Sequence, residues 1–137
     1  MEGWHESKVR VRFEETDMMG VVYYAKFLVW FEVGRIGLLR DIGLPYSNWS
    51  KLGFHIPVVQ AHADYRASAR LDDEILVRTR IARIGSSSIR FENEVYKLPK
   101  KELLCTGHTV HAQVAPSGKA TPFSAVLRRR LALASKL

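Results

Sequence analysis

The chain has 137 residues, of which 47% are hydrophobic and 26% charged, a composition typical of one folded domain and unlike that of a disordered protein. Its apolar runs are interrupted by charge well short of the roughly 18 residues that a membrane-spanning helix needs, and residues 1–8 lack the pattern of a signal peptide. The single cysteine, Cys105, excludes an intrachain disulfide and fits a reducing compartment. We therefore expect a cytoplasmic protein.

The net charge of +7 favours an anionic partner. Nucleic acid is one candidate, but the basic residues are scattered through strand-like segments and form a run only at residues 128–130. A phosphorylated small molecule would satisfy the same charge balance. The remaining alternative is a basic surface that has no dedicated partner.

A strand is predicted over residues 8–14, where apolar and charged residues alternate and Phe13 falls on the apolar face. The apolar segment from about residue 24 to residue 40 is too long for a typical strand, so we predict a helix there that is covered on nearly all sides. Gly34 and Gly37 each cost up to about 1 kcal/mol inside a helix. Their presence predicts the close approach of another backbone.

Residues 46–54 are expected to form a loop or short helix, in which Trp49 is a candidate lid over a site. Beyond them the hydrophobic period changes to two, which predicts strands over residues 56–68, 74–84, 89–97 and 102–114, joined by tight turns. A basic tail or short helix is expected over residues 123–137. The sequence contains no repeat or linker, so residues 1–137 are predicted to form one domain with a core at about 8–115.

The order of these elements predicts the class of fold. One strand, one long helix and then four strands joined by tight turns favour an α+β protein, in which a five-stranded antiparallel sheet wraps around one central helix. A single helix covers only part of such a sheet. We therefore expect an oligomer.

The loop before the predicted helix carries the strongest chemical signal. It holds a carboxylate, Asp17, and a glycine, Gly20, that predicts either a positive φ angle or room for a substrate. The N–H groups at a helix start are unpaired and carry partial positive charge, so they can stabilise an oxyanion. Asp17 is thus a candidate acid or base. The alternative is that it only caps the helix or orders the loop.

These residues resemble the signature of the 4-hydroxybenzoyl-CoA thioesterase family, whose members have the hotdog fold. The matching positions are Thr16, Asp17, Gly20, Val21, Val22 and Phe27. Tyr24 departs from the signature, which has His or Phe at that place. Phe31 and Glu32 are similar to the Phe-Glu pair on the helix of the YbgC-like acyl-CoA thioesterase branch.

The resemblance implies an acyl-CoA thioesterase that releases a carboxylate and coenzyme A, with its site at the interface of a homodimer that assembles into a homotetramer. It casts Asp17 as nucleophile or as general base, and the backbone amide of Tyr24 as the donor that polarises the thioester carbonyl. The substrate pocket would be lined by Gly20, Val21, Phe27, Trp49, Val58 and Val59. The acyl group itself is left open.

Coenzyme A carries several phosphate charges, which would account for the basic excess of the chain. The predicted turn at residues 85–88 offers hydroxyl and N–H groups beside two arginines, and the resemblance implies coenzyme A binding around it. The candidate residues are Arg83, Ser86, Ser87, Ser88 and Arg90, with residues 128–130 as a second candidate. The alternative is an ordinary hairpin with solvated arginines.

Other residues are assigned structural roles. Glu32 is a candidate catalyst, although a buried ion pair with Arg35 or with a strand arginine is the favoured reading. Cys105 is expected in the core. No histidine, cysteine or carboxylate spacing predicts a metal site, and no separate cofactor is expected.

The alternative functions are a hotdog protein that binds acyl-CoA or nucleic acid without catalysis, and a hydratase or dehydratase on the same fold.

Overall fold

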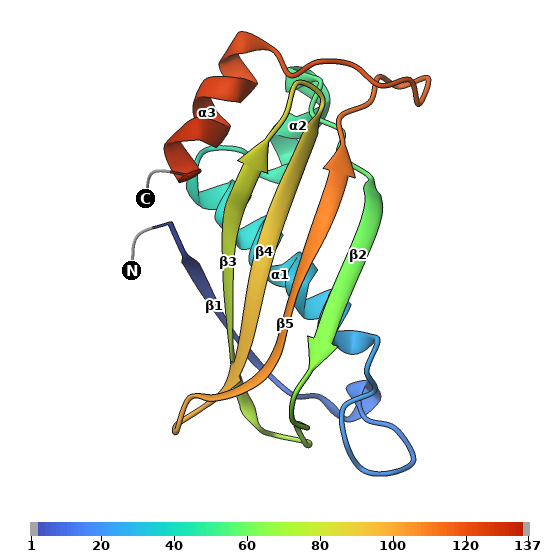
Figure 1. Cartoon of the computed structure of the whole chain (residues 1–137), viewed down its shortest axis with the longest axis vertical. Helices are drawn as coiled ribbons and strands as arrows, with labels where there is room; N and C mark the ends of the chain where they lie inside the picture. The colour runs from blue at the N-terminus through green and yellow to red at the C-terminus, as the bar shows by residue number, and fades with distance from the viewer. Residues whose placement is uncertain (1–2, 136–137) are drawn as a thin grey trace.

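A computed structural model describes residues 3–135 and has the predicted α+β architecture, an antiparallel sheet curved around one long helix (Figure 1). The sheet has five strands in the order β1-β3-β4-β5-β2, and every neighbouring pair is antiparallel. The terminal residues of the predicted domain and tail, 1–2 and 136–137, lie outside the described residues. The strands are β1 (His5–Arg10), β2 (Val58–Tyr65), β3 (Glu74–Ile84), β4 (Ser88–Lys97) and β5 (Glu102–Ala112).

The long helix α1 (Lys26–Asp41) lies in the concave face of the sheet, as predicted. The glycines of α1 make that contact possible. A Cβ atom at Gly34 would overlap the side chain of Thr79 on β3, and one at Gly37 would lie 2.6 Å from His5 Nε2 on β1. A close approach therefore occurs at both glycines, but side chains make it, whereas another backbone was predicted.

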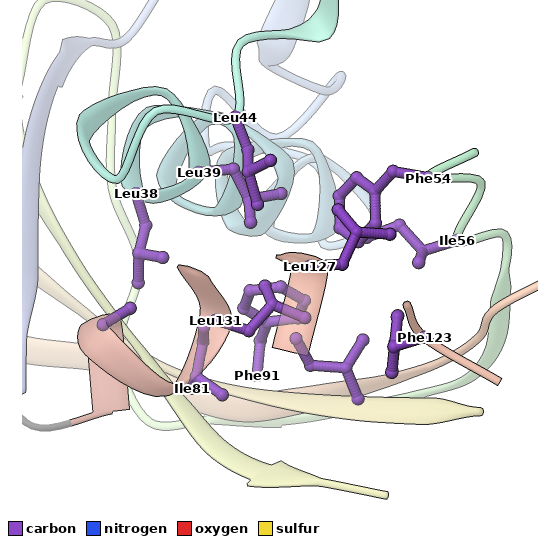
Figure 2. Packing of buried hydrophobic residues seen from close by; sticks show 12 residues of the cluster. Leu38, Leu39, Leu44, Phe54, Ile56, Ile81, Phe91, Phe123, Leu127 and Leu131 are labelled. Atoms are coloured by element: carbon purple, nitrogen blue, oxygen red, sulfur yellow. The ribbon is translucent and has the colours of Figure 1, made fainter. Parts of the chain in front are cut away.

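All but one of the shorter helical elements within the described residues gather at one end of the sheet. They are two 3-10 turns, η1 (Phe13–Glu15) and η2 (Tyr46–Asn48), and two α-helices, α2 (Trp49–Leu52) and α3 (Ala125–Ser135), of which all but η1 lie at that end. Leu127 and Leu131 of α3 pack against Phe91 of β4 and Leu39 of α1 in one buried cluster (Figure 2). The tail predicted from residue 123 is thus a helix that completes the core.

A second buried cluster lies near the beginning of α1. Phe27, Trp30 and Phe31 pack there against strand residues that include Val77 and Cys105. Cys105 is a buried core residue, as expected, and its burial raises the pKa of the thiol to about 12. No helix within residues 3–135 combines the length and apolar character that crossing a bilayer would take.

Two predictions were wrong in detail. The first strand ends at Arg10, and Phe13, expected on its buried face, is 79% exposed. The chain turns there because Glu15 Oε1 accepts a hydrogen bond from the Arg12 N–H at 2.8 Å, which closes the 3-10 turn η1. Nor is α1 covered on nearly all sides, since Val29 is 42% exposed and Val33 is 38% exposed.

Candidate active site

The Asp17 loop, residues 16–22, is a small closed turn. Its two ends meet in a bridge between Thr16 and Val22, and the Asp17 N–H donates to the Val21 carbonyl at 2.8 Å. Gly20 has a φ of 80°, a conformation that favours glycine. The predicted positive φ is therefore confirmed.

The carboxylate of Asp17 uses only one of its oxygens to hold this loop. Oδ1 accepts hydrogen bonds from the Met19 N–H at 2.8 Å and from the Val21 N–H at 3.4 Å. Within residues 3–135, no donor is bonded to Oδ2. Asp17 does order the loop, as the structural alternative proposed, but one oxygen of a half-buried carboxylate stays available for chemistry.

Glu15 is a buried carboxylate that sequence reasoning missed. Its side chain accepts hydrogen bonds from the Arg12 N–H and from the Trp30 indole, and its backbone carbonyl accepts one from the Tyr23 N–H at 2.8 Å. Burial by itself would raise the pKa of Glu15, but hydrogen bonds from the Arg12 backbone, Trp30 and the Arg12 side chain outweigh it and lower the pKa. Glu15 thus links the segment before Asp17, at Arg12, to the segment after it, at Tyr23 and Trp30.

The start of α1 follows the Asp17 loop directly. The backbone N–H of Tyr24 donates to no acceptor within residues 3–135 and lies just before the first turn of the helix, so it is free to bind a carbonyl oxygen. The Tyr24 carbonyl is itself fixed, because the hydroxyl of Tyr65 on β2 donates to it at 2.9 Å. The Tyr65 ring also packs edge-on against buried Phe27, with ring centroids 5.4 Å apart.

The predicted phosphate-binding residues form what we call the turn cluster, defined as Arg83, Ser86, Ser87, Ser88 and Arg90. Arg83 and Arg90 are directly paired across β3 and β4. Like charges opposite one another on a sheet repel. Glu92 Oε2 lies 3.7 Å from Arg90 Nη2 and offsets part of this repulsion, and a bound anion would relieve the remainder. The hydroxyl-bearing residues Ser86 and Ser88 are exposed.

The turn itself is held by α3. Arg128 Nη2 donates to the Gly85 carbonyl at 2.8 Å and to the Ser86 carbonyl at 3.2 Å, and the Phe123 N–H donates to the same Ser86 carbonyl. The second candidate run, residues 128–130, therefore includes one arginine whose head group contacts the turn cluster.

Within one chain, the predicted site residues fall into two groups at opposite ends of the molecule (Figure 1). Asp17, Gly20, Val21, Tyr24 and Phe27 lie at one end. The turn cluster and Val58 lie at the other end, since Val58 begins β2 and Tyr65 finishes it, about 23 Å away. Val58 and its neighbour Val59 are exposed on this edge strand.

Trp49 also lies at the end of the turn cluster. Its indole donates to the Leu44 carbonyl at 2.8 Å, and its ring packs edge-on against Phe54 in the core. In one chain it therefore covers the core rather than the Asp17 loop. Its role as a lid stays a prediction.

Glu32 is exposed rather than buried, and its Oε2 lies 3.9 Å from Nη2 of the buried Arg35. The predicted ion pair thus exists, with only its arginine buried. Burial lowers the pKa of Arg35, and the charge of Glu32 counteracts this. His62 and His108 are directly paired on β2 and β5, with stacked rings. Among residues 3–135, no cluster of three or more His, Cys, Asp or Glu side chains could hold a metal ion.

Comparison with known proteins shows which family and which relatives this sequence matches. The sequence matches the thioesterase-like superfamily over residues 11–131. The acyl-CoA thioesterase YbgC of Haemophilus influenzae is 32% identical over 117 residues, which cover 83% of this chain and 82% of that protein.

Solved structures agree with that match. Slr0204, a 1,4-dihydroxy-2-naphthoyl-CoA thioesterase from Synechocystis, superposes with a TM-score of 0.85 at 26% identity, over 95% of this chain and 96% of that one. A thioesterase from Thermus thermophilus, solved with coenzyme A and zinc, superposes with a TM-score of 0.83 at 30% identity, over 98% of each chain.

Proposed function

This chain belongs to the thioesterase-like superfamily, and from that premise we propose how it hydrolyses an acyl-CoA to a carboxylate and free coenzyme A. The observation that supports the proposal best concerns two polar groups on adjoining segments, each of which has a hydrogen-bonding position left open. Among residues 3–135, no donor binds one oxygen of Asp17, and the Tyr24 N–H finds no acceptor. The free oxygen of Asp17 can accept a proton or attack a carbon atom. The Tyr24 N–H can bind the carbonyl oxygen that becomes negatively charged.

The chemistry follows from these two groups. The Tyr24 N–H donates to the thioester carbonyl oxygen, and the positive end of the α1 dipole adds to the stabilisation of the oxyanion. Oδ2 of Asp17 is the reacting oxygen by either route. It takes a proton from the water that attacks the carbonyl carbon, or it attacks that carbon itself to give an acyl anhydride that water then hydrolyses. In both cases the carbon–sulfur bond breaks and the thiolate of coenzyme A leaves.

We assign coenzyme A to the turn cluster, with Arg83 and Arg90 facing its phosphate groups and the serine hydroxyls donating to them. One chain does not bring this cluster to its own Asp17. The exposed edge strand β2 offers a solution, because antiparallel pairing of β2 with β2 of a second copy places Tyr65 of one chain beside Val58 of the other. Each complete site then combines the Asp17 loop of one chain with the turn cluster of its partner.

Several finer statements rest on this proposal and stay predictions. They are that Val58, Val59 and Trp49 of the partner line the acyl pocket, that two dimers form a homotetramer, and that the protein is cytoplasmic. No metal or separate cofactor takes part in the proposed reaction, since its two steps need only a carboxylate, an amide and water.

The test is a hydrolysis screen that follows release of free thiol from short, long and aromatic acyl-CoAs. Asp17→Asn should lower kcat by at least about 100-fold on every substrate that the wild type cleaves. Asp72→Asn is the matched control, because Asp72 is an exposed turn residue whose positive φ asparagine tolerates, and it should leave kcat unchanged. Wild-type turnover by Asp17→Asn would overturn the assignment, and comparison across the acyl groups would define the preferred substrate.

A further inference from the structure

A second set of reactive side chains lies at the far end of α1 from Asp17. His5 Nδ1 is 3.0 Å from Asp41 Oδ2, and His5 Nε2 is 3.0 Å from Ser7 Oγ. The carboxylate takes the hydrogen of Nδ1, so Nε2 carries the lone pair that accepts the hydroxyl hydrogen of Ser7. Acid, imidazole and hydroxyl are thus linked in the order, and through the nitrogen atoms, that activate a serine nucleophile.

The fold builds this arrangement from three positions. His5 and Ser7 are two residues apart on β1, so their side chains share the face that looks toward α1. Asp41 is the last residue of α1. Gly37 leaves room between them, because a Cβ atom there would lie 2.6 Å from His5 Nε2 and 3.1 Å from Ser7 Oγ. The imidazole is consequently enclosed, with only 16% of its side chain exposed.

A cavity of about 460 Å³ opens onto these groups. Val33 and Ile36 of α1 give it an apolar wall against which a short acyl chain can pack. Its charged lining residues are Glu6, Glu32, Arg40 and Asp41. Because carboxylates predominate, the cavity repels a polyanion such as coenzyme A and favours an uncharged or cationic ligand.

We propose that this cavity is a second hydrolytic site, which cleaves small carboxylic esters of uncharged or cationic alcohols with Ser7 as the nucleophile. His5 Nε2 takes the proton of the Ser7 hydroxyl as its oxygen attacks the ester carbonyl carbon. The ester C–O bond then breaks, and the alcohol leaves with the proton from His5. Water, deprotonated by the same nitrogen, hydrolyses the acyl group from Ser7 and restores the hydroxyl.

Two further groups support this reaction. Asp41 holds the His5 ring in the tautomer that can accept the serine proton, and it stabilises the imidazolium that forms. The guanidinium of Arg40 supplies positive charge to the cavity in which the oxyanion develops. The site is independent of Asp17, since the 16 residues of α1 separate the two by about 24 Å.

The test uses diisopropyl fluorophosphate, an uncharged probe that forms an O–P bond with an activated serine and releases fluoride. Intact protein should gain one label, which peptide mass spectrometry places on Ser7. His5→Gln should lower the labelling rate at least about 100-fold, and Asp41→Asn should lower it by a smaller factor. Ser50→Ala is the matched control, because Ser50 is an exposed serine outside the cavity, and its labelling should equal that of the wild type.

Catalysis is measured with p-nitrophenyl acetate in the Asp17→Asn protein, which removes the Asp17 route. Adding Ser7→Ala should lower the remaining rate at least about 100-fold, with an unchanged circular dichroism spectrum. Absence of label on Ser7 of the wild-type protein would overturn the proposal whether or not the variants fold. An ester hydrolysis rate that does not respond to Ser7→Ala would also overturn it.

Discussion

The indole N–H of Trp30 donates to Glu15 Oε2 at 3.1 Å, and this bond ties the buried side of α1 to the chain that leads into the Asp17 loop. Both residues are almost completely buried, with Glu15 3% exposed. The opposite oxygen of Glu15 binds the Arg12 N–H at 2.8 Å. A carboxylate two residues before Asp17 therefore fixes the position of the loop against the helix whose first turn supplies the proposed oxyanion donor.

Replacing Glu15 tests this positioning role. Glu15→Gln should lower kcat for acyl-CoA at least about tenfold with little change in KM, because the Asp17 loop shifts while the turn cluster is untouched. It should also destabilise the fold by about 1–3 kcal/mol, since a charged acceptor of buried donors is lost. Glu14→Gln makes the same charge change at an exposed neighbour and should leave both quantities unchanged. Steady-state kinetics and urea unfolding measure the two effects, and a normal kcat in Glu15→Gln would contradict the role.

The same contact has a consequence at low pH. The pKa of Glu15 is lower in the folded protein than in the unfolded chain. At pH values between the two pKa values, Glu15 is therefore charged in the folded protein but protonated in the unfolded chain. The stability that Glu15 provides is complete above its ordinary pKa and is lost as the pH falls through the lower pKa of the folded state. Glu15→Gln should therefore be less sensitive to acid below pH 4.5 than the wild type, in urea unfolding at a series of pH values.

Mixing two inactive variants tests whether the active site is shared between chains. One variant carries Asp17→Asn, and the other carries Arg83→Gln with Arg90→Gln. If each site combines the Asp17 loop of one chain with the turn cluster of the other, a mixed dimer has one intact site. Unfolding and refolding an equal mixture should thus restore about a quarter of the wild-type activity, because half of the dimers are mixed and one of their two sites works.

That mixing experiment has a clear contrary outcome. A site contained within one chain would be broken in every protomer, so the refolded mixture would be as inactive as its components. Each variant refolded alone gives the baseline. Light scattering on the same samples shows whether the chains form dimers or tetramers.

Arg128 and Arg129 offer a matched pair on α3. The side chain of Arg128 binds the carbonyls of Gly85 and Ser86, whereas that of Arg129 is exposed and makes no hydrogen bond or ion pair within residues 3–135. Arg128→Gln should raise the KM for acyl-CoA about three- to tenfold with kcat unchanged, because the turn cluster loses its support. Arg129→Gln removes the same charge and should leave KM near the wild-type value. Equal effects of the two changes would show that α3 acts only through its net charge.

Much of the fold follows from local patterns. The strand at residues 74–84 has the bounds predicted for it, because its alternating residues lie between two turn signals and pair with strands on both sides. The helix was predicted from length and composition, and its glycines are closely approached, although by side chains where another backbone was expected. The Asp17 loop was identified from its residue types and spacing. Each of these signals lies within a continuous stretch of the sequence.

The features that the sequence did not predict depend on contacts between distant residues. Glu15 looks like an ordinary loop carboxylate until Trp30, in the second turn of α1, is placed against it. The alternation of strand residues continues to Phe13 in the sequence, but the chain has already turned away. The separation of Val58 from Asp17 depends on which end of β2 meets the start of α1, and no spacing in the sequence encodes that. The distance between the two groups of predicted site residues within one chain is therefore harder to predict than the fold that carries them.

His111 provides a pH prediction that is independent of catalysis. Its ring is 1% exposed, donates from Nδ1 to the Ile56 carbonyl at 2.8 Å and accepts at Nε2 from the Thr109 hydroxyl at 2.9 Å. Burial lowers the pKa of His111 from 6.5 to about 4, with Arg35 adding to the shift and the Ile56 contact opposing it. The unfolded chain therefore binds a proton that the folded protein excludes between these two pH values.

The stability contributed by neutral His111 should be complete above pH 6.5 and should fall as the pH drops toward 4, by up to about 3 kcal/mol. Urea unfolding across this range measures the slope. His111→Gln should be less stable than the wild type at pH 7 but should lose less stability on acidification, since no buried imidazole remains. An unchanged slope in His111→Gln would show that another group causes the acid sensitivity.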